Sequence, residues 1–292
     1  FSFVVDKNGQ VVDPVVEDSS GIRAFEKAGL KAIRQWQYTP AKRDGETIEQ
    51  CLNSVRLDYR LDSGTKGGRR RFVKEYKEAQ EALASDDLAF TETLIGKMEE
   101  GKIWNSYEDA WFWMLKAELA KKQGNEVAQL ANISRVVSGS ESDVYIGEQT
   151  FLYLLQQKFI LEVRASRFVD ALSTFERIGQ RPESDQIVAQ LEVYANKVKQ
   201  YLTDEEYVLV KGQIDEDGDW WHSLSRNIFS FTNISGNLDS VELRCANKRE
   251  KYTFAADSQW HIPQSWGRCK VMVVGENQAN FSLVEIRQDV KV

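Results

Sequence analysis

The chain has few of the residues that most often carry catalysis or metal binding. Its 292 residues include only two histidines, three cysteines and three methionines. It contains no phosphate loop, no nucleophile elbow and no metalloprotease helix. A dispersed catalytic triad would need one of the two histidines as its base, and no carboxylate pair stands out among the acidic residues. We therefore expect a protein that is not an enzyme and that holds no metal or cofactor.

Two further absences limit the environment and the partners of the chain. No apolar run approaches the about 20 residues that a membrane helix needs, and no signal peptide is recognisable. The net charge of −7 lacks the basic excess of a general nucleic-acid binder. Apolar residues make up 42% of the chain, which is enough for ordinary globular cores, and the length fits two or three domains.

The first sixty residues have the pattern of a small α/β unit. Residues 1–6 alternate as in a strand with one buried face, and the odd-numbered positions are apolar. Asn8 and Gly9 form a strong hairpin signal, because both residues accept a positive φ. The second strand covers residues 10–17 and contains Pro14, which suits an edge strand or a bulge.

A helix and a last strand complete this unit. Residues 19–21 (Ser-Ser-Gly) can end the second strand and cap a helix. Apolar residues then recur at helical spacing as far as Trp36, and Pro40 stops the helix. We expect the last strand to run from Thr47 to Leu61, with Val55 on its apolar face.

These features, in this order, resemble the carboxy-terminal domain of TonB. The resemblance combines a hairpin, a helix cap and a helix terminator, and it covers about a fifth of the chain. The family domain normally opens with a further helix, so we expect an amino-terminally incomplete domain at residues 1–62. The matching residues are Phe3, Val4, Val5, Asp6, Lys7, Asn8, Gly9, Ser19, Ser20, Gly21, Phe25, Ala28, Ala32, Ile33, Trp36, Tyr38, Pro40 and Ala41.

The resemblance implies a periplasmic module of a Gram-negative bacterium that couples an inner-membrane motor to outer-membrane transporters. Such modules accept an extended receptor segment beside their last strand, which is β-augmentation. The resemblance also implies a membrane anchor outside this sequence, and pairing of two copies through their strands. The expected partner-strand residues are Gln50, Cys51, Leu52, Asn53, Ser54 and Val55.

The middle of the chain is helical. Residues 63–71 have the composition of a linker, and after them the apolar period changes from two to about 3.6. We expect seven helices in paired order over residues 72–203. The spacing of Phe168, Ala171 and Phe175 resembles the second half of a tetratricopeptide repeat.

Helical-hairpin arrays often hold a protein or peptide on their concave side. Three tryptophans, Trp104, Trp111 and Trp113, could line such a groove. The alternative is that they pack in the core or between hairpins. A periplasmic scaffold that binds proteins through this array, without energy transduction, is the second functional hypothesis.

Residues 204–292 return to a period of two. Short strands at this spacing predict a small antiparallel sandwich or barrel. The acidic residues 215–219 are expected to form a hairpin turn, because the distal glutamate of a calcium loop is missing. Trp220, Trp221 and Trp260 are expected to pack in the core or at an edge, with an aromatic sugar-binding surface as the alternative.

The cysteines suggest an oxidising compartment. Cys245 and Cys269 both lie in predicted strands of the β-rich region, and a disulfide between them would suit the periplasm. Two reduced, buried thiols are the alternative. Taken together, the sequence predicts an α+β protein of several domains: a TonB-like unit at 1–62, a linker at 63–71, a helical-hairpin domain at 72–203 and a β-rich domain at 204–292.

Overall fold

The computed structural model describes residues 1–17, 19, 23–57, 67–100, 105–138 and 142–290. Contacts between residues divide the chain into two compact units. Unit 1 combines residues 1–57 and 196–292 with a short helical stretch, residues 165–170. Unit 2 contains most of the helical region, residues 58–164 and 171–195. Mixed α+β architecture with antiparallel sheets is therefore confirmed.

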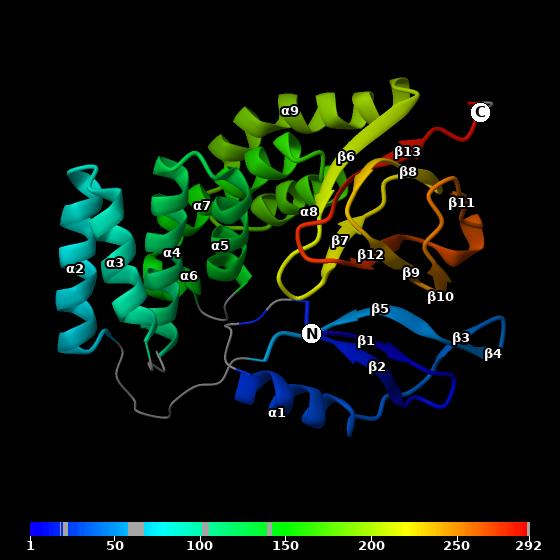
Figure 1. Cartoon of the computed structure of the whole chain (residues 1–292), viewed down its shortest axis with the longest axis horizontal. Coiled ribbons are helices and arrows are strands. Elements are labelled where there is room, and N and C mark those ends of the chain that lie inside the picture. Colours follow the sequence, from blue (N-terminus) through cyan, green and yellow to red (C-terminus); the bar gives the residue numbers. More distant parts are fainter. Residues whose placement is uncertain (18, 20–22, 58–66, 101–104, 139–141, 291–292) are drawn as a thin grey trace. The chain divides into compact units, whose positions relative to one another are not determined.

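The first part of unit 1 is a three-stranded antiparallel sheet with one helix, here called the amino-terminal sheet. Its strand order is β2-β1-β5, and helix α1 lies along one face (Figure 1). A separate hairpin, β3–β4, precedes β5. The bounds are β1 Ser2–Val5, β2 Val11–Val15, α1 Arg23–Ile33, β3 Ala41–Arg43, β4 Glu46–Ile48 and β5 Gln50–Ser54.

The hairpin between β1 and β2 forms where the sequence predicts it. Gly9 has a φ of 82°, and the side chain of Asp6 accepts hydrogen bonds from the backbone N–H groups of Asn8 and Gln10. Gly9 is also required by space, because a Cβ there would lie 1.9 Å from the carbonyl oxygen of Tyr38. The turn therefore fixes the path of the chain after α1 as well as the register of the hairpin.

The last strand differs from the prediction. Instead of running continuously from Thr47, the chain forms the short β4, breaks at Glu49 and then forms β5, which ends at Ser54. Two different neighbours explain the break, since β4 pairs with β3 whereas β5 pairs with β1. Residues 58–61 of the predicted strand lie outside the described residues.

Strand β1 is buried on both faces, although its alternation predicts one buried face. Phe3 and Val5 pack with Ile33 of α1, as expected. Ser2 and Val4 on the opposite face are also buried, at 4% and 1% exposure. This second face meets β9 of the β-rich region, where the hydroxyl of Ser2 accepts a hydrogen bond from Arg244.

The helical region forms antiparallel hairpins around one hydrophobic core. Seven predicted helices are present, and a short eighth, α6, was missed because its five residues are too few to show a period. Asp87 and Asn105 cap α3 and α4 by accepting hydrogen bonds from backbone N–H groups. The bounds are α2 Arg70–Ala84, α3 Leu88–Glu99, α4 Ser106–Lys122, α5 Glu126–Ser138, α6 Ser142–Ile146, α7 Glu148–Arg164, α8 Phe168–Gly179 and α9 Asp185–Asp204.

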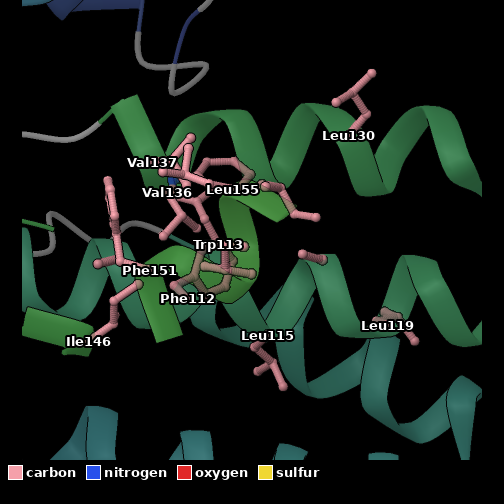
Figure 2. Close-up of a cluster of buried hydrophobic side chains, with 14 of the residues drawn as sticks. Phe112, Trp113, Leu115, Leu119, Leu130, Val136, Val137, Ile146, Phe151 and Leu155 are labelled. Carbon is pink, nitrogen blue, oxygen red and sulfur yellow. The ribbon is translucent and has the colours of Figure 1, made fainter. Parts of the chain in front are cut away.

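The core of unit 2 is built from the facing sides of these hairpins. Phe112 and Trp113 of α4 lie beside Val136 of α5 and Leu155 of α7 (Figure 2). All four side chains are at most 6% exposed. Aromatic residues at adjacent positions of α4 are both buried because α4 has neighbours on more than one side.

The β-rich region is a two-sheet structure with jelly-roll connectivity. The sheets have the orders β10-β9-β12-β7 and β11-β8-β13-β6, and all pairs are antiparallel. This interleaving of eight strands is the arrangement of a double Greek key. The bounds are β6 Tyr207–Gln213, β7 Asp219–Ser223, β8 Ile228–Ser235, β9 Leu238–Cys245, β10 Arg249–Thr253, β11 Gln259–His261, β12 Cys269–Gly275 and β13 Asn280–Ile286.

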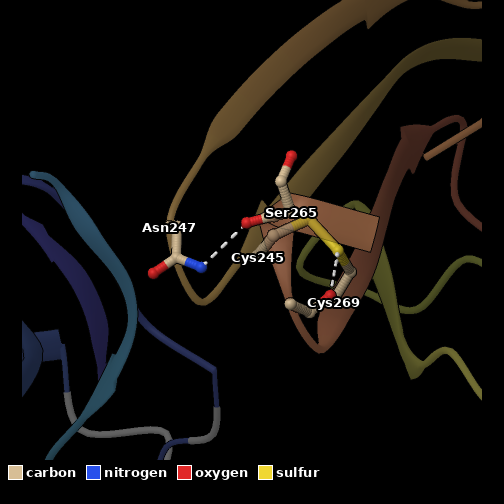
Figure 3. Close-up of a disulfide and its surroundings, with 5 residues drawn as sticks. Cys245, Asn247, Ser265 and Cys269 are labelled. Atoms are coloured by element: carbon tan, nitrogen blue, oxygen red, sulfur yellow. Dashed lines mark hydrogen bonds between the residues drawn. A yellow bond between two sulfur atoms is a disulfide. The ribbon is translucent and has the colours of Figure 1, made fainter. Parts of the chain in front are cut away.

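Cys245 and Cys269 form a disulfide that joins paired residues of β9 and β12. Figure 3 shows it beside a loop in which the side chain of Asn247 donates a hydrogen bond to the carbonyl of Ser265, at 3.1 Å. The disulfide predicted from the sequence is therefore present in the structure. Cys51, the third cysteine, is a free, buried thiol.

Candidate functional site

The strand predicted to receive a partner, β5, lies at an edge of the amino-terminal sheet. It pairs with β1 on one side. In the part of the chain that the structure describes, no strand pairs with its other side. An edge strand of this kind presents a row of unpaired backbone groups to another extended segment.

The direction of these backbone groups follows from the register. Phe1 and Val55 exchange two backbone hydrogen bonds, at 3.0 and 2.9 Å, so they form a hydrogen-bonded pair. The next pair, Ser2 and Ser54, is therefore a non-hydrogen-bonded pair, whose N–H and C=O groups point away from each other. The N–H and C=O of Ser54 consequently point to the open edge.

The six predicted partner-strand residues have different environments. Leu52 is 37% exposed, and Gln50 and Ser54 are exposed as well. The side chain of Asn53 donates a 2.6 Å hydrogen bond to the carbonyl of Gln50, so that carbonyl already has a partner. A bulge between β1 and β5 accompanies this contact and shortens the regular part of the edge. The part of the β5 edge that stays open to a partner therefore lies around Ser54.

Cys51 belongs to the covered side of β5. Its side chain is 1% exposed, and burial, with a smaller effect of the Glu49 carboxylate, raises the pKa of the thiol to about 11. A thiol with such a pKa stays protonated near neutral pH, so it is a poor nucleophile. Cys51 therefore packs as a small apolar residue.

The second face of the amino-terminal sheet is covered by β9, which carries a buried ion pair of its own. Arg244 is 2% exposed, and its guanidinium donates to Glu242 at 2.6 Å and to the Ser2 hydroxyl at 3.0 Å. On the next strand, Arg249 pairs with Asp13. With α1 on one face and β9 on the other, a partner strand would reach this sheet at an edge, and β5 is one of its two edge strands.

Sequence reasoning missed Arg244 as a key contact residue. A glutamate and an arginine two positions apart in a strand are the pattern expected for its solvent-exposed side. The detectable signal was indirect: Ser2 and Val4 were assigned to an exposed face, although residues 1–5 contain only one polar side chain. A strand so apolar is typical of one that is buried on both faces.

Of the tryptophans proposed for a helical groove, Trp111 and Trp113 are not among the residues that line an open groove found in unit 2. Trp113 is 6% exposed and stacks beneath the guanidinium of Arg135. Trp111 is half-buried, and its indole N–H donates to the carbonyl of Tyr145. Trp104 lies outside the described residues. An open groove of about 290 Å³ instead lies between α2, α4 and α7, with Tyr76, Gln80, Leu83, Met114, Glu118 and Tyr153 among its walls.

The two histidines of the jelly roll are in separate places. His222 on β7 is 2% exposed, and its Nε2 lies 2.8 Å from Glu285 on β13. The second oxygen of Glu285 accepts hydrogen bonds from the backbone and hydroxyl of Ser225. His261 lies on β11 in the other sheet from His222 and contacts Gln259. Among the described residues, no cluster of three potential metal ligands occurs.

The other aromatic and acidic features of the jelly roll have structural roles. Trp260 is buried and stacks on Phe229, and Trp220 packs edge-on against Phe281. The acidic residues 215–219 form a turn with Gly218 at a positive φ, but the prediction of a hairpin is wrong, because β6 and β7 on either side of the turn belong to different sheets. In this turn, the side chain of Asp215 accepts a hydrogen bond from the backbone N–H of Asp217.

Comparison with known proteins identifies the first segment. Residues 1–61 match the family model described as Gram-negative bacterial TonB protein C-terminal. No curated protein and no solved structure was found to match the chain. Across the described residues, none of the helices has the length and apolar character to cross a membrane.

Proposed function

Because residues 1–61 belong to the TonB C-terminal family, whose members are periplasmic proteins of Gram-negative bacteria that interact with other proteins, we propose that this chain binds an extended segment of an outer-membrane transporter along β5. The partner segment would add a fourth strand beside β5 by β-augmentation. The single observation that carries this proposal is the open edge at Ser54, whose backbone N–H and C=O point away from β1.

The arrangement around β5 suits a strand that must carry load. Helix α1 packs on one face of the sheet and the Arg244–Glu242 pair on the other, so β5 is held by contacts that a partner does not touch. Strand pairing places several hydrogen bonds side by side, and a pull along the strand loads them together. We propose that the full-length protein is anchored in the inner membrane and transmits force in this way, without catalysis.

A substitution at Ser54 separates backbone pairing from side-chain recognition. Ser54→Pro removes the outward N–H of residue 54 but none of the N–H groups that donate to β1. Ser54→Ala removes only the side-chain hydroxyl. We expect Ser54→Pro to weaken binding by about tenfold, the equivalent of one lost hydrogen bond, and Ser54→Ala to bind within about twofold of the parent. Fluorescence anisotropy with a labelled periplasm-facing segment of a transporter measures both.

Equal binding by the two variants, each with an unchanged unfolding transition, would contradict pairing at this edge. A Tyr153→Ala variant is included in the same series, because Tyr153 lines the groove of unit 2 and lies far along the chain from β5. Retained binding by this variant is expected.

The groove between α2, α4 and α7 favours a second candidate function, a periplasmic scaffold that binds proteins through its helices. The groove combines an apolar floor at Leu83 and Met114 with polar groups at Gln80 and Glu118. If Tyr153→Ala abolishes partner binding and Ser54→Pro does not, the scaffold is the better account. A precursor with an upstream membrane helix and a proline-rich spacer would favour the transducer, and one with only a cleavable signal peptide would favour the scaffold.

A further inference from the structure

The edge strands of the jelly roll differ in how they are protected from pairing. Strand β11 has only three residues, and β10 carries three consecutive charged residues from Arg249. Short or charged edges of this kind discourage strand addition. Strand β6, by contrast, has seven residues in unbroken register with β13, contains no proline and carries a single charge, at Lys211.

The hydrogen bonds at both ends of β6 show which of its backbone groups are open. Ile214 donates to the carbonyl of Ala279 and Arg287 donates to the carbonyl of Glu206, both at 2.9 Å. In the register between β6 and β13, these contacts place the even-numbered residues of β6 in hydrogen-bonded pairs with β13. The N–H and C=O groups of the odd-numbered residues therefore point outward. These residues are Tyr207, Leu209, Lys211 and Gln213.

This outer edge is accessible and well supported. Tyr207 is 44% exposed and Leu209 is 47% exposed, and Lys211 and Gln213 are exposed as well. The alternate residues Val208 and Val210 are at most 1% exposed and hold β6 on the core. Within the ranges that the structure describes, no strand pairs with the outer side of β6.

The charges at the two ends of β6 select the kind of partner. Exposed acidic residues precede the strand at positions 204–206 and follow it at positions 215–217. Two arginines also lie at the first group: Arg226 donates to the backbone carbonyls of Glu205 and Glu206, and Arg287 to that of Asp204. Arg287 is also paired with Asp289, so the carboxylates at this end outnumber the cations. A second copy of β6, antiparallel about Val210, would place Glu205 opposite Asp215 of that copy, and a parallel copy would align the acidic ends directly. Like charges in such positions destabilise strand pairing, so an extended segment with basic ends fits better.

We propose that the β6 edge binds an extended segment of another protein as an added strand. The segment would have about five to seven residues that alternate between apolar and polar side chains, with lysine or arginine at both ends. Its backbone would pair with the four outward residues of β6, and its basic ends would meet the two acidic groups. This site is separate from β5 and does not depend on the proposed role of β5.

The probe for this proposal is a synthetic peptide of alternating valine and threonine with two lysines at each end. Hydrogen exchange of the full chain, read by NMR, is expected to slow at least about tenfold at the amides of Leu209 and Lys211 in saturating peptide. A peptide with glutamates at both ends should bind at least about tenfold more weakly, and raised salt should reduce this difference.

Two substitutions at one position complete the test. Leu209→Pro removes an outward N–H but no donor to β13 and should lose the peptide, whereas Leu209→Ala should keep binding within about threefold. Ser54→Pro should leave this peptide's affinity unchanged, so failure at β5 and failure at β6 are distinguishable. The proposal is overturned if millimolar peptide leaves the four amides unprotected, or if they become protected by raising the concentration of the chain alone, which would indicate self-pairing.

Discussion

At the scale of single residues, burial controls the behaviour of the charged side chains in unit 1. Arg244 and Glu242 are both nearly inaccessible, and each satisfies the other. The Asp219 carboxylate is less well stabilised. Burial and, to a smaller extent, the Asp215 carboxylate raise its pKa to about 6. The two cases differ in the presence of a cation, and they lead to opposite expectations on substitution.

Asp219→Asn should stabilise the protein at neutral pH. The carboxyl has a pKa of about 6 when folded and an ordinary value of 3.8 when unfolded. The folded state therefore binds more protons between these values, and the free energy of unfolding falls as the pH rises through this window. Above it the full cost of the buried charge is present, so the variant should be more stable by about 1–2 kcal/mol at pH 7.5, after allowance for partial exposure.

Urea unfolding at pH 4 and pH 7.5 measures this difference. The two proteins should converge at the lower pH, where the Asp219 carboxyl is protonated in the folded state. Asp217→Asn, at an exposed position of the same turn, is the matched control and should show a smaller change. A stabilisation of Asp219→Asn that is equal at both pH values would contradict the assigned cause.

At the scale of helices and strands, the sequence predicted the local structure of each segment better than it predicted which segments pack together. Asn8-Gly9 correctly indicated a hairpin and Gly9 has the expected positive φ, because turn chemistry acts within a few residues. The alternation in residues 204–292 correctly predicted an antiparallel β-rich region, while it left a sandwich and a barrel as alternatives. The edge at β5 could be expected from the family resemblance, but neither the bulge nor the contact from Asn53 to Gln50 is visible in the sequence pattern.

Long-range contacts explain what the sequence did not reveal. Ser2 and Arg244 are separated by 242 positions, so no periodicity in either segment could indicate their hydrogen bond. Similarly, β4 and β5 were merged into one strand because their separate partners, β3 and β1, are not visible in an apolar pattern. The burial of Trp111 and Trp113 was likewise not visible in the local sequence, because the neighbours that cover them come from other helices.

The buried ion pair within β9, whose Arg244 also donates to Ser2 of β1, can be tested by a double-mutant cycle. Arg244→Met leaves Glu242 buried without its cation, and we expect a loss of about 3–5 kcal/mol in the free energy of unfolding. The double variant with Glu242→Met removes both charges and should lose clearly less than the single variant. Urea unfolding measures all members of the cycle.

Lys248→Met provides the control for this cycle, because Lys248 pairs with Glu250 on the exposed surface of the same β-rich region. Its effect should stay within about 1 kcal/mol. A double variant as unstable as Arg244→Met alone would contradict the assigned cause, because the loss would then not come from the unpaired charge of Glu242.

At the scale of the whole molecule, one chain carries several surfaces that suit extended partners. The amino-terminal sheet offers the edge of β5, the jelly roll offers the edge of β6, and unit 2 has a groove between its helices. The family match concerns only the first of these. One face of the amino-terminal sheet is covered by β9 of the jelly roll, so this face is not free for pairing of two copies. The edges of the sheet are the parts that remain for strand addition.

The most direct test of the central claim is crosslinking in intact cells from a photoreactive residue at position 52. Leu52 is the suitable site because its side chain is 37% exposed, whereas the side chain of Asn53 is engaged with Gln50. The account predicts a covalent adduct with an outer-membrane transporter, mapped to an extended periplasmic segment and lost in the Ser54→Pro background. Adducts with soluble envelope proteins alone, or adducts unaffected by Ser54→Pro, would contradict it.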